Sequence, residues 1–267
     1  MSDTAVIHEQ AAVPQPAQHG RPGGMLRHTS IITGTVAGLV LAVITYAIGS
    51  HYFVPWGEQN ADFSQVGLDA LVAATYVAWV IGFMAGIGAF AGPIRWALGH
   101  DLTHADAEYM AGRGQGKWRY WKYTTDHKVV GFQYLIMAMV LLGLGGFLAM
   151  LIRTELGVTW AEVFDPNFYN SLIGTHGIVM VIAMIIVVAG PLGNFIVPIM
   201  IGARDMAFPR LNALSFWLLF AAVPPLVSNL LLGGMRDGWT VYQPLGNQAP
   251  VGMIGYQVCI IVFAFST

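Results

Sequence analysis

Charged side chains are scarce in this sequence: Asp, Glu, Lys and Arg make up 10% of the 267 residues, against 56% hydrophobic residues. A water-soluble domain usually carries about 25% charged residues. The composition therefore excludes that class and points to a protein that crosses a membrane several times. The formal net charge of -2 says nothing about nucleic acid. We expect no nucleic-acid partner, because the basic and aromatic residues of the chain lie beside membrane spans and favour a lipid surface.

Cysteine is nearly absent as well, since Cys259 is the single one in the sequence. One thiol excludes a disulfide framework and a Cys-x-x-Cys metal site. Because Cys259 lies in an apolar run, we expect it to pack as a small buried hydrophobic side chain.

Long runs without charge are abundant. About 20 apolar residues cross the hydrocarbon core of a bilayer as a helix. The runs therefore predict an all-α fold, a polytopic transmembrane helix bundle of about six spans, with the last one cut short. The predicted spans are 29–50, 70–94, 129–152, 169–200, 211–235 and 251–267. In the second span, Gly82, Gly86, Gly88 and Gly92 predict close helix packing.

Polar stretches divide the chain into four parts. Residues 1–28 are predicted to be a flexible tail, 29–95 two transmembrane helices, 96–128 a cytoplasmic basic and aromatic segment, and 129–267 four further helices. Beside membrane spans, Lys and Arg interleaved with Trp and Tyr favour an anchor on an anionic lipid surface. His100 and His104, four residues apart, form a candidate metal pair for which the sequence fixes no third ligand.

Lysine and arginine also predict the orientation. With the amino terminus in the cytoplasm, the inner segments hold nearly all of these residues, as the positive-inside rule requires. The inner ones are Arg21, Arg27, Arg95, Arg113, Lys117, Arg119, Lys122, Lys128, Arg204 and Arg210, and the outer ones are Arg153 and Arg236. This orientation places Asp205 at the inner end of the bundle.

His176 lies inside a membrane-length apolar run, where an ionisable group is costly and usually functional. A neutral imidazole is a good axial ligand for haem iron, and Gly174 and Gly177 would give a flat helix face for a haem edge. The alternative is a histidine that is hydrogen-bonded to a neighbouring helix. Arg153 ends the preceding span at the same outer level as His176, where a guanidinium can reach toward water.

Asp205 lies in the short turn between two spans. Asn194 before it and Asn212 and Ser215 after it can hold a row of water molecules between helices, and a carboxylate at the mouth can collect protons. The alternative is a helix N-cap, because Pro209 follows near the start of the next helix. At the opposite end, Trp239 and Tyr242 are typical of aromatic residues at a membrane interface.

Several ordered motifs in the second half resemble one family. They are TTDHK, LIRTEL, THGIVM, GNFIVPIMIGA, DMAFPRLNALSFWL and GWTVYQPL, and they are similar to motifs of the catalytic subunit of haem-copper oxidases, the cytochrome c oxidase subunit I type. The resemblance implies that 129–267 form the first four core helices of the oxidase fold, which is incomplete here. The helices in 29–95 would then be extra, an extension that docks a neighbouring subunit.

The resemblance also implies roles for individual residues. His176 would be one of two axial ligands of a low-spin haem, expected to be haem a, and Arg153 would hydrogen-bond a substituent of that haem. Trp239 and Tyr242 would lie near the haem propionates, with Arg236 or Asp237 beside them. Asp205 would be the entrance acid of a proton path lined by Asn194, Asn212 and Ser215, with Ser266 and Thr267 near path serines.

Other parts of the family pattern are missing. The second axial histidine and the ligands of a high-spin haem and of copper are not found, so we expect a truncated or split subunit that is active only with its remainder. Expected partners are that remainder, a subunit II where electrons enter, a subunit III, and cytochrome c or quinol. The expected location is the bacterial inner (plasma) membrane. The alternatives are a quinol oxidase and a haem-free proton-coupled transporter or assembly subunit.

One spacing departs from the family pattern, because the interval from His176 to Asn194 is one residue shorter. One residue rotates a helix by about 100°. Either a helical bulge is therefore absent here, or Asn194 points elsewhere.

Overall fold

The computed structural model describes residues 24–59, 64–99, 103–157, 160, 162–235, 238–242 and 252–266. The predicted tail is thus largely outside the described residues. Throughout the described ranges the regular structure is helical, which confirms the all-α prediction. The helices are α1 (Gly24–His28), α2 (Ile31–Gln59), α3 (Ser64–Ile87), α4 (Ala91–Ala97), α5 (His104–Met110), α6 (His127–Gly157), α7 (Pro166–Val187), α8 (Gly193–Ile201), α9 (Pro209–Ser228) and α10 (Gly252–Ser266).

Among the described residues, five helical segments are long and apolar enough to cross a membrane: 31–55, 66–87, 127–157, 166–201 and 209–228. Helix α10 is apolar but shorter, at 15 residues. These segments make the chain a multi-pass membrane protein. The fourth continues from α7 through a π-helical turn, Val188–Leu192, into α8.

Several predicted boundaries were wrong. The first span ends at Pro55 rather than at 50, and the third ends at Gly157 rather than at 152. The second span ends at Ile87 rather than at 94, because Gly88 adopts a left-handed conformation with φ of +91° and the chain restarts as the separate helix α4. The fifth span ends at Ser228 rather than at 235, and turns follow it. Hydropathy did not mark either end, because apolar residues continue past both.

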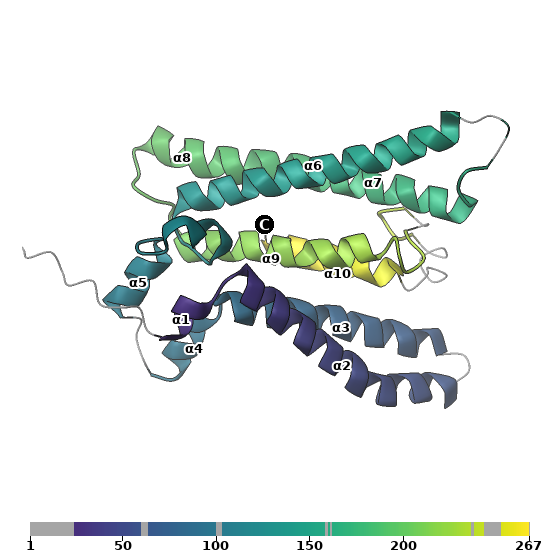
Figure 1. The fold of residues 1–267 in the computed structure, drawn as a ribbon, viewed down its shortest axis with the longest axis horizontal. Coiled ribbons are helices and arrows are strands. Elements are labelled where there is room, and N and C mark those ends of the chain that lie inside the picture. The colour runs from purple at the N-terminus through teal and green to yellow at the C-terminus, as the bar shows by residue number, and fades with distance from the viewer. Residues whose placement is uncertain are drawn as a thin grey trace, which may run out of the picture.

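The long helices lie roughly along one direction and pair with their neighbours in sequence: α2 with α3, α6 with α7, and α9 with α10 (Figure 1). Helix α3 also contacts α9 and α10. The α2–α3 pair is close because a Cβ at Gly86 would lie 2.4 Å from the Thr33 carbonyl oxygen, and one at Gly82 would lie 2.7 Å from that of Ala37. Small residues at these positions let the two backbones approach, as predicted for this span.

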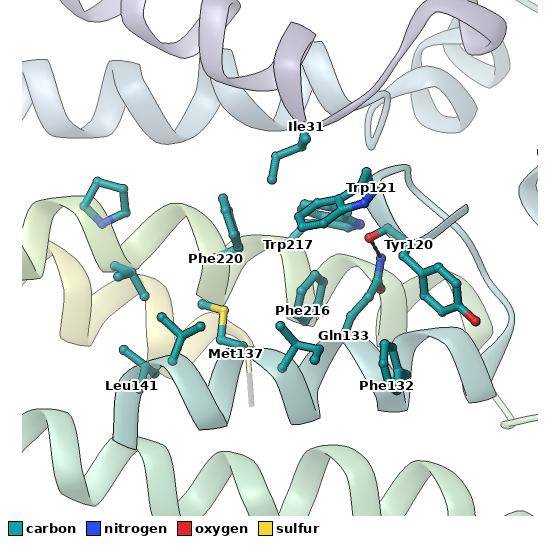
Figure 2. Close-up of a pocket in the computed structure, with 14 residues that line it drawn as sticks. Ile31, Tyr120, Trp121, Phe132, Gln133, Met137, Leu141, Phe216, Trp217 and Phe220 are labelled. Atoms are coloured by element: carbon teal, nitrogen blue, oxygen red, sulfur yellow. Dashed lines mark hydrogen bonds between the residues drawn. The ribbon is translucent and has the colours of Figure 1, made fainter. Parts of the chain in front are cut away.

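Aromatic residues of α9 form the centre of the core. Phe216, Trp217 and Phe220 pack against one another, and Phe83 of α3 contacts Trp217 and Phe220 (Figure 2 shows the three α9 residues). The indole nitrogen of Trp79 donates to the Ala221 carbonyl at 2.9 Å. These contacts hold the amino-terminal hairpin against α9 of the same chain.

The segment between α4 and α6 folds against one end of the bundle (Figure 1). Arg95 of α4 pairs with the buried carboxylate of Asp106 in α5. A 3₁₀ helix, Gly116–Trp121, follows, and the Tyr123 hydroxyl donates to the Arg210 carbonyl at 2.8 Å. Burial raises the pKa of Tyr123 to about 12. The polar segment and the turn with Asp205 therefore lie at the same end.

Candidate functional site: an acidic turn, an amide pair and a membrane histidine

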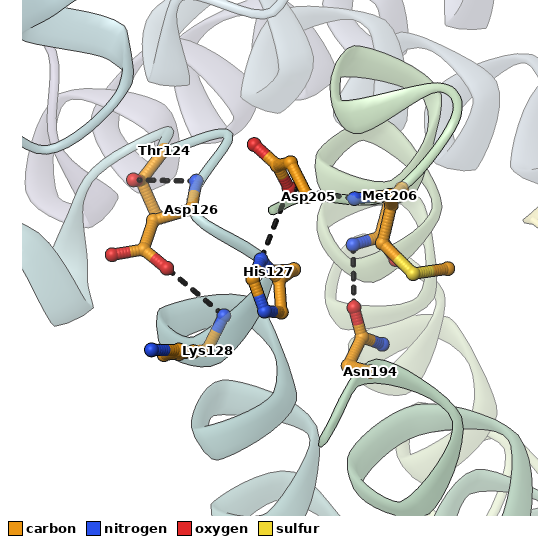
Figure 3. A network of polar contacts seen from close by, with 8 residues as sticks. Thr124, Asp126, His127, Lys128, Asn194, Asp205 and Met206 are labelled. Atoms are coloured by element: carbon orange, nitrogen blue, oxygen red, sulfur yellow. Dashed lines mark hydrogen bonds and ion pairs between the residues drawn. The ribbon is translucent and has the colours of Figure 1, made fainter. Parts of the chain in front are cut away.

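The turn between α8 and α9 holds Asp205 at the end of the bundle. Helix α8 stops at Gly202, whose left-handed φ of +66° ends the helix. Asp205 Oδ1 accepts a hydrogen bond from the Met206 amide at 2.8 Å and lies 3.0 Å from Nδ1 of His127 (Figure 3). The carboxylate is thus fixed on one side by backbone and imidazole, and it stays 46% exposed.

Asp205 is not the N-cap of the following helix. The N-cap of α9 is Phe208, which makes no side-chain cap bond. The carboxylate is committed to the turn and to His127, so the capping alternative is wrong. The remaining part of the carboxylate is open to water.

His127 is a site residue that the sequence reasoning missed. It begins α6, 78 positions before Asp205, and its side chain is only 8% exposed. The first turn of α6 is held by Asp126, whose Oδ1 accepts from the Lys128 amide at 2.9 Å. The motif TTDHK was the available signal, because it matched the family without a role attached to its histidine.

Behind the turn, two amides meet in the interior. Asn212 Nδ2 of α9 donates to Asn194 Oδ1 of α8 at 2.6 Å, and Asn194 Nδ2 donates to the Gly190 carbonyl at 2.8 Å. Asn194 is buried, at 3% exposed. Gly131 lets α6 pack closely against Asn194 of α8, because a Cβ at Gly131 would lie only 3.0 Å from Asn194 Cβ.

The π-helical turn resolves the spacing between His176 and Asn194. It lies at Val188–Leu192, directly before α8, and changes the helical rotation at that point. A helical bulge is therefore present, and Asn194 faces Asn212, so both alternatives that the spacing suggested are wrong.

The next polar contact lies deeper. The Tyr134 hydroxyl is 2.7 Å from Ser215 Oγ, and Ser215 Oγ donates to the Asn212 carbonyl at 2.8 Å. Tyr134, another residue that sequence reasoning missed, fits because Gly190 has no side chain: a Cβ there would lie 2.5 Å from Tyr134 Cγ. A cavity of about 400 Å³ beside this contact is lined by Asn212, Ser215 and Ser266, among others.

His176 lies in α7 and reaches across to α6. Its Nδ1 is 2.9 Å from the carbonyl oxygen of Gly145. Because a carbonyl can only accept, Nδ1 carries the hydrogen, and Nε2 of the neutral ring keeps a lone pair for a metal. Iron-bound histidines commonly hold their second nitrogen in this way. The hydrogen bond to a neighbouring helix is thus present and leaves ligation possible.

The two glycines that flank His176 differ. A Cβ at Gly177 would meet nothing within 4 Å, so this side of α7 is open to a flat ligand. A Cβ at Gly174 would lie 2.9 Å from the Met235 carbonyl oxygen, so Gly174 serves packing rather than an open face. The expected flat face is therefore supplied by Gly177 alone.

The remaining candidate residues lie toward the other end. Arg153 is exposed on α6, eight residues and about 12 Å of helix beyond Gly145. Trp239 and Tyr242 are 66% and 74% exposed. Arg236, Asp237, Thr267 and His100 lie outside the described residues, and the described part of the chain holds no cluster of three metal-binding side chains.

The fold and the site together define an integral membrane protein that keeps polar groups between its helices. Residues 129–267 match the family model of cytochrome c and quinol oxidase polypeptide I. The match covers more than half of the sequence, and the chain belongs to this family, that of the haem-copper oxidase subunit I.

Curated relatives agree with the family model. Over 132 residues the chain is 47% identical to "Cytochrome c oxidase subunit 1" of Thermostichus vulcanus. The aligned residues make up 48% of this chain and 24% of that protein. Over 140 residues it is 41% identical to "Probable quinol oxidase subunit 1" of Staphylococcus aureus, which covers 51% of this chain and 21% of that protein. The chain thus spans about a quarter of the length of these relatives.

Proposed function

We propose that this chain is the amino-terminal part of the catalytic subunit of a respiratory oxidase that reduces O2 to water and pumps protons. The observation that carries this proposal is the inner row of polar groups: Asp205 with His127, then Asn194 with Asn212, then Ser215. The cavity along Asn212 and Ser215 has room for the water that would link them. Asp205 receives protons at the surface, and the amides and hydroxyls orient the water.

The proposal assigns His176 to a low-spin haem, haem a, as one axial ligand. This haem, when bound, supplies one-electron transfer. The chain contributes an imidazole whose tautomer the Gly145 carbonyl fixes, and an open helix side at Gly177. In this proposal Arg153, Trp239 and Tyr242 line the outer side of the haem. The second axial ligand, the high-spin haem and copper belong to the remainder of the subunit.

The same proposal includes the membrane, the orientation of the chain in it, and the partners. The basic segments of the described chain lie at the end that holds Asp205, which favours a cytoplasmic amino terminus in the bacterial plasma membrane. Subunit II, where electrons enter, subunit III and the remainder of subunit I are the proposed partners. Cytochrome c is the proposed donor. A quinol donor is the second candidate, because a relative named as a probable quinol oxidase is 41% identical.

The histidine assignment is tested by a reduced-minus-oxidised spectrum of the purified complex. His176→Ala should remove the low-spin haem band, whereas His51→Ala, on the exposed part of α2, should leave it intact. A haem-free transporter would give no such band in the wild type. Survival of the band in His176→Ala would show that this imidazole is not a ligand.

The proton assignment is tested with Asp205→Asn, which keeps the size of the side chain and removes its acid. Turnover should slow or pumping should cease while the haem spectrum stays unchanged. Asp165→Asn is the matched control, because it changes an exposed carboxylate at the opposite end and asparagine also caps helices. Wild-type turnover and pumping in the Asp205 variant would reject the role.

A further inference from the structure

A groove lies where the amino-terminal hairpin, α6 and α9 come together. Its volume is about 530 Å³, and it is lined by Ile31 at the start of α2, by side chains of α6 and α9, and by Tyr120 and Trp121 of the 3₁₀ helix (Figure 2). Apart from these two aromatic residues and Gln133, the lining is apolar. Neither Asp205 nor His176 lines the groove, so the groove is separate from the site described above.

The groove has the depth of one membrane leaflet. Along α6 its lining runs from Phe132 to Leu141, which is nine residue-to-residue steps or about 14 Å of helix. The hydrocarbon core of a bilayer is about 30 Å thick, so the groove covers about half of it. It begins at Trp121, which is 46% exposed and typical of the membrane interface. An acyl chain that descends from the interface would follow this path.

Gln133 gives the groove a polar anchor. Its side chain is 5% exposed, and Nε2 donates to the Tyr120 carbonyl at 2.9 Å, which fixes the orientation of the amide. The carbonyl oxygen Oε1 is buried and has no hydrogen-bond partner among the described residues. An unsatisfied buried acceptor is costly, so a ligand with a hydroxyl group near the interface would fit this position.

Two basic residues, Lys117 and Arg119, belong to the 3₁₀ helix whose Tyr120 and Trp121 line the groove. Arg119 lies over the ring of Tyr120 at 5.0 Å and donates to its hydroxyl at 3.0 Å, and Lys117 is exposed on the same 3₁₀ helix. Lys122 is engaged by the Arg27 carbonyl and the Tyr109 hydroxyl. The acid that acts on Arg119 from nearby is Asp126. Two cations against one acid favour an anionic head group.

We propose that this groove binds one molecule of phosphatidylglycerol. An acyl chain would lie along Val140 and Phe220, the phosphate would face Arg119 and Lys117, and a head-group hydroxyl would donate to Gln133 Oε1. This lipid would fill the space between the hairpin and the rest of the bundle. The proposal rests on the groove alone and does not depend on the oxidase function.

The test is native mass spectrometry of the purified complex, together with binding of phosphatidylglycerol after a delipidating wash. The wild type should retain one phosphatidylglycerol and bind it more tightly than phosphatidylcholine with the same acyl chains. Removing both cations in Lys117→Gln/Arg119→Gln should weaken binding by about 5-fold for each charge. Gln133→Leu should weaken it by about 5-fold through the lost hydrogen bond.

Matched variants separate these effects from general damage. Val140→Trp should fill the groove and abolish retention, whereas Met150→Trp, at an exposed position of α6 outside the groove, should not. Arg113→Gln removes an exposed cation that is already paired with Glu108 and lies outside the 3₁₀ helix, and it should leave binding unchanged. The proposal is overturned by a quinone in place of the lipid, by equal binding of both phospholipids, or by unchanged binding in the charge and Gln133 variants.

Discussion

Replacing Asn212 by leucine tests the inner row of polar groups at the hydrogen bond between Asn212 and Asn194. The change removes the donor that lies 2.6 Å from Asn194 Oδ1 and replaces a polar part of the neighbouring cavity wall by an apolar one. Asn194 is only 3% exposed, so its acceptor cannot turn to bulk water. A buried hydrogen bond that is left unmade costs about 1–3 kcal/mol.

That penalty has two measurable consequences. If protons pass along water beside Asn212, losing one bonding partner raises the barrier by a similar amount, and turnover should fall by about 5- to 150-fold. Oxygen consumption by the purified complex, with saturating donor, measures this fall. The haem spectrum should stay unchanged, because His176 is on another helix. The melting temperature should drop as well, since Asn194 loses its partner.

The control is Asn170→Leu, which makes the same chemical change at an exposed position of α7 toward the other end. It should alter neither turnover nor the melting temperature by much. A lower melting temperature in Asn212→Leu together with wild-type turnover would refute the reasoning. The amide pair would then be structural, and the proton path would lie elsewhere.

Three further predictions concern packing and charge. Gly190→Ala should push Tyr134 away from its serine partner and cost about 1–3 kcal/mol, seen as a lower melting temperature; an unchanged value would contradict this contact. Arg95→Leu should lower the free energy of unfolding by about 2–4 kcal/mol, because the carboxylate of Asp106 stays buried without its cation. The loss is smaller than for a fully buried pair, since Arg95 is 30% exposed. Arg113→Leu, which breaks a more exposed pair, is the control and should cost less. Tyr123, whose pKa is raised to about 12, should make the protein lose stability as pH rises from about 10 to 12; in melting curves Tyr123→Phe should lack this component, and an identical alkaline loss would count against it.

The sign of the alkaline effect follows from burial. The folded protein keeps the Tyr123 hydroxyl protonated up to about pH 12, whereas the unfolded chain releases the proton near 10. Stabilisation by the neutral hydroxyl is therefore complete below about 10 and is lost as pH rises through the folded pKa.

Hydropathy predicted the number of long helices well but not all their ends. The end of the second span at Ile87 depends on the backbone of Gly88, and the end of the fifth at Ser228 on turns that are themselves apolar. The sequence also indicated that Asn194, Asn212 and Asp205 lie near one end. It did not reveal the pairing of Asp205 with His127, because contacts across 78 positions leave no local pattern.

The alternatives that the sequence left open for Asp205, Asn194 and His176 were decided by local backbone geometry and hydrogen bonds. Whether Asp205 caps a helix depends on where α9 begins, and the start of α9 at Pro209 excludes it. The direction of Asn194 depends on the π-helical turn, which the sequence spacing alone did not show. A hydrogen bond from His176 to a neighbouring helix was considered as the alternative to haem binding, yet the bond to Gly145 uses only Nδ1 and leaves Nε2 available for a metal.

The tight glycine contact between α2 and α3 bears on how the protein is made. These helices are neighbours in the sequence, and the contact of Gly86 with the Thr33 backbone needs no later segment. The hairpin can therefore assemble in the lipid while the ribosome is still adding α6 to α10. The hydrogen bond from Trp79 to the Ala221 carbonyl would then join α9 to a hairpin that is already paired, so this hairpin can serve as a template for the helices that follow it.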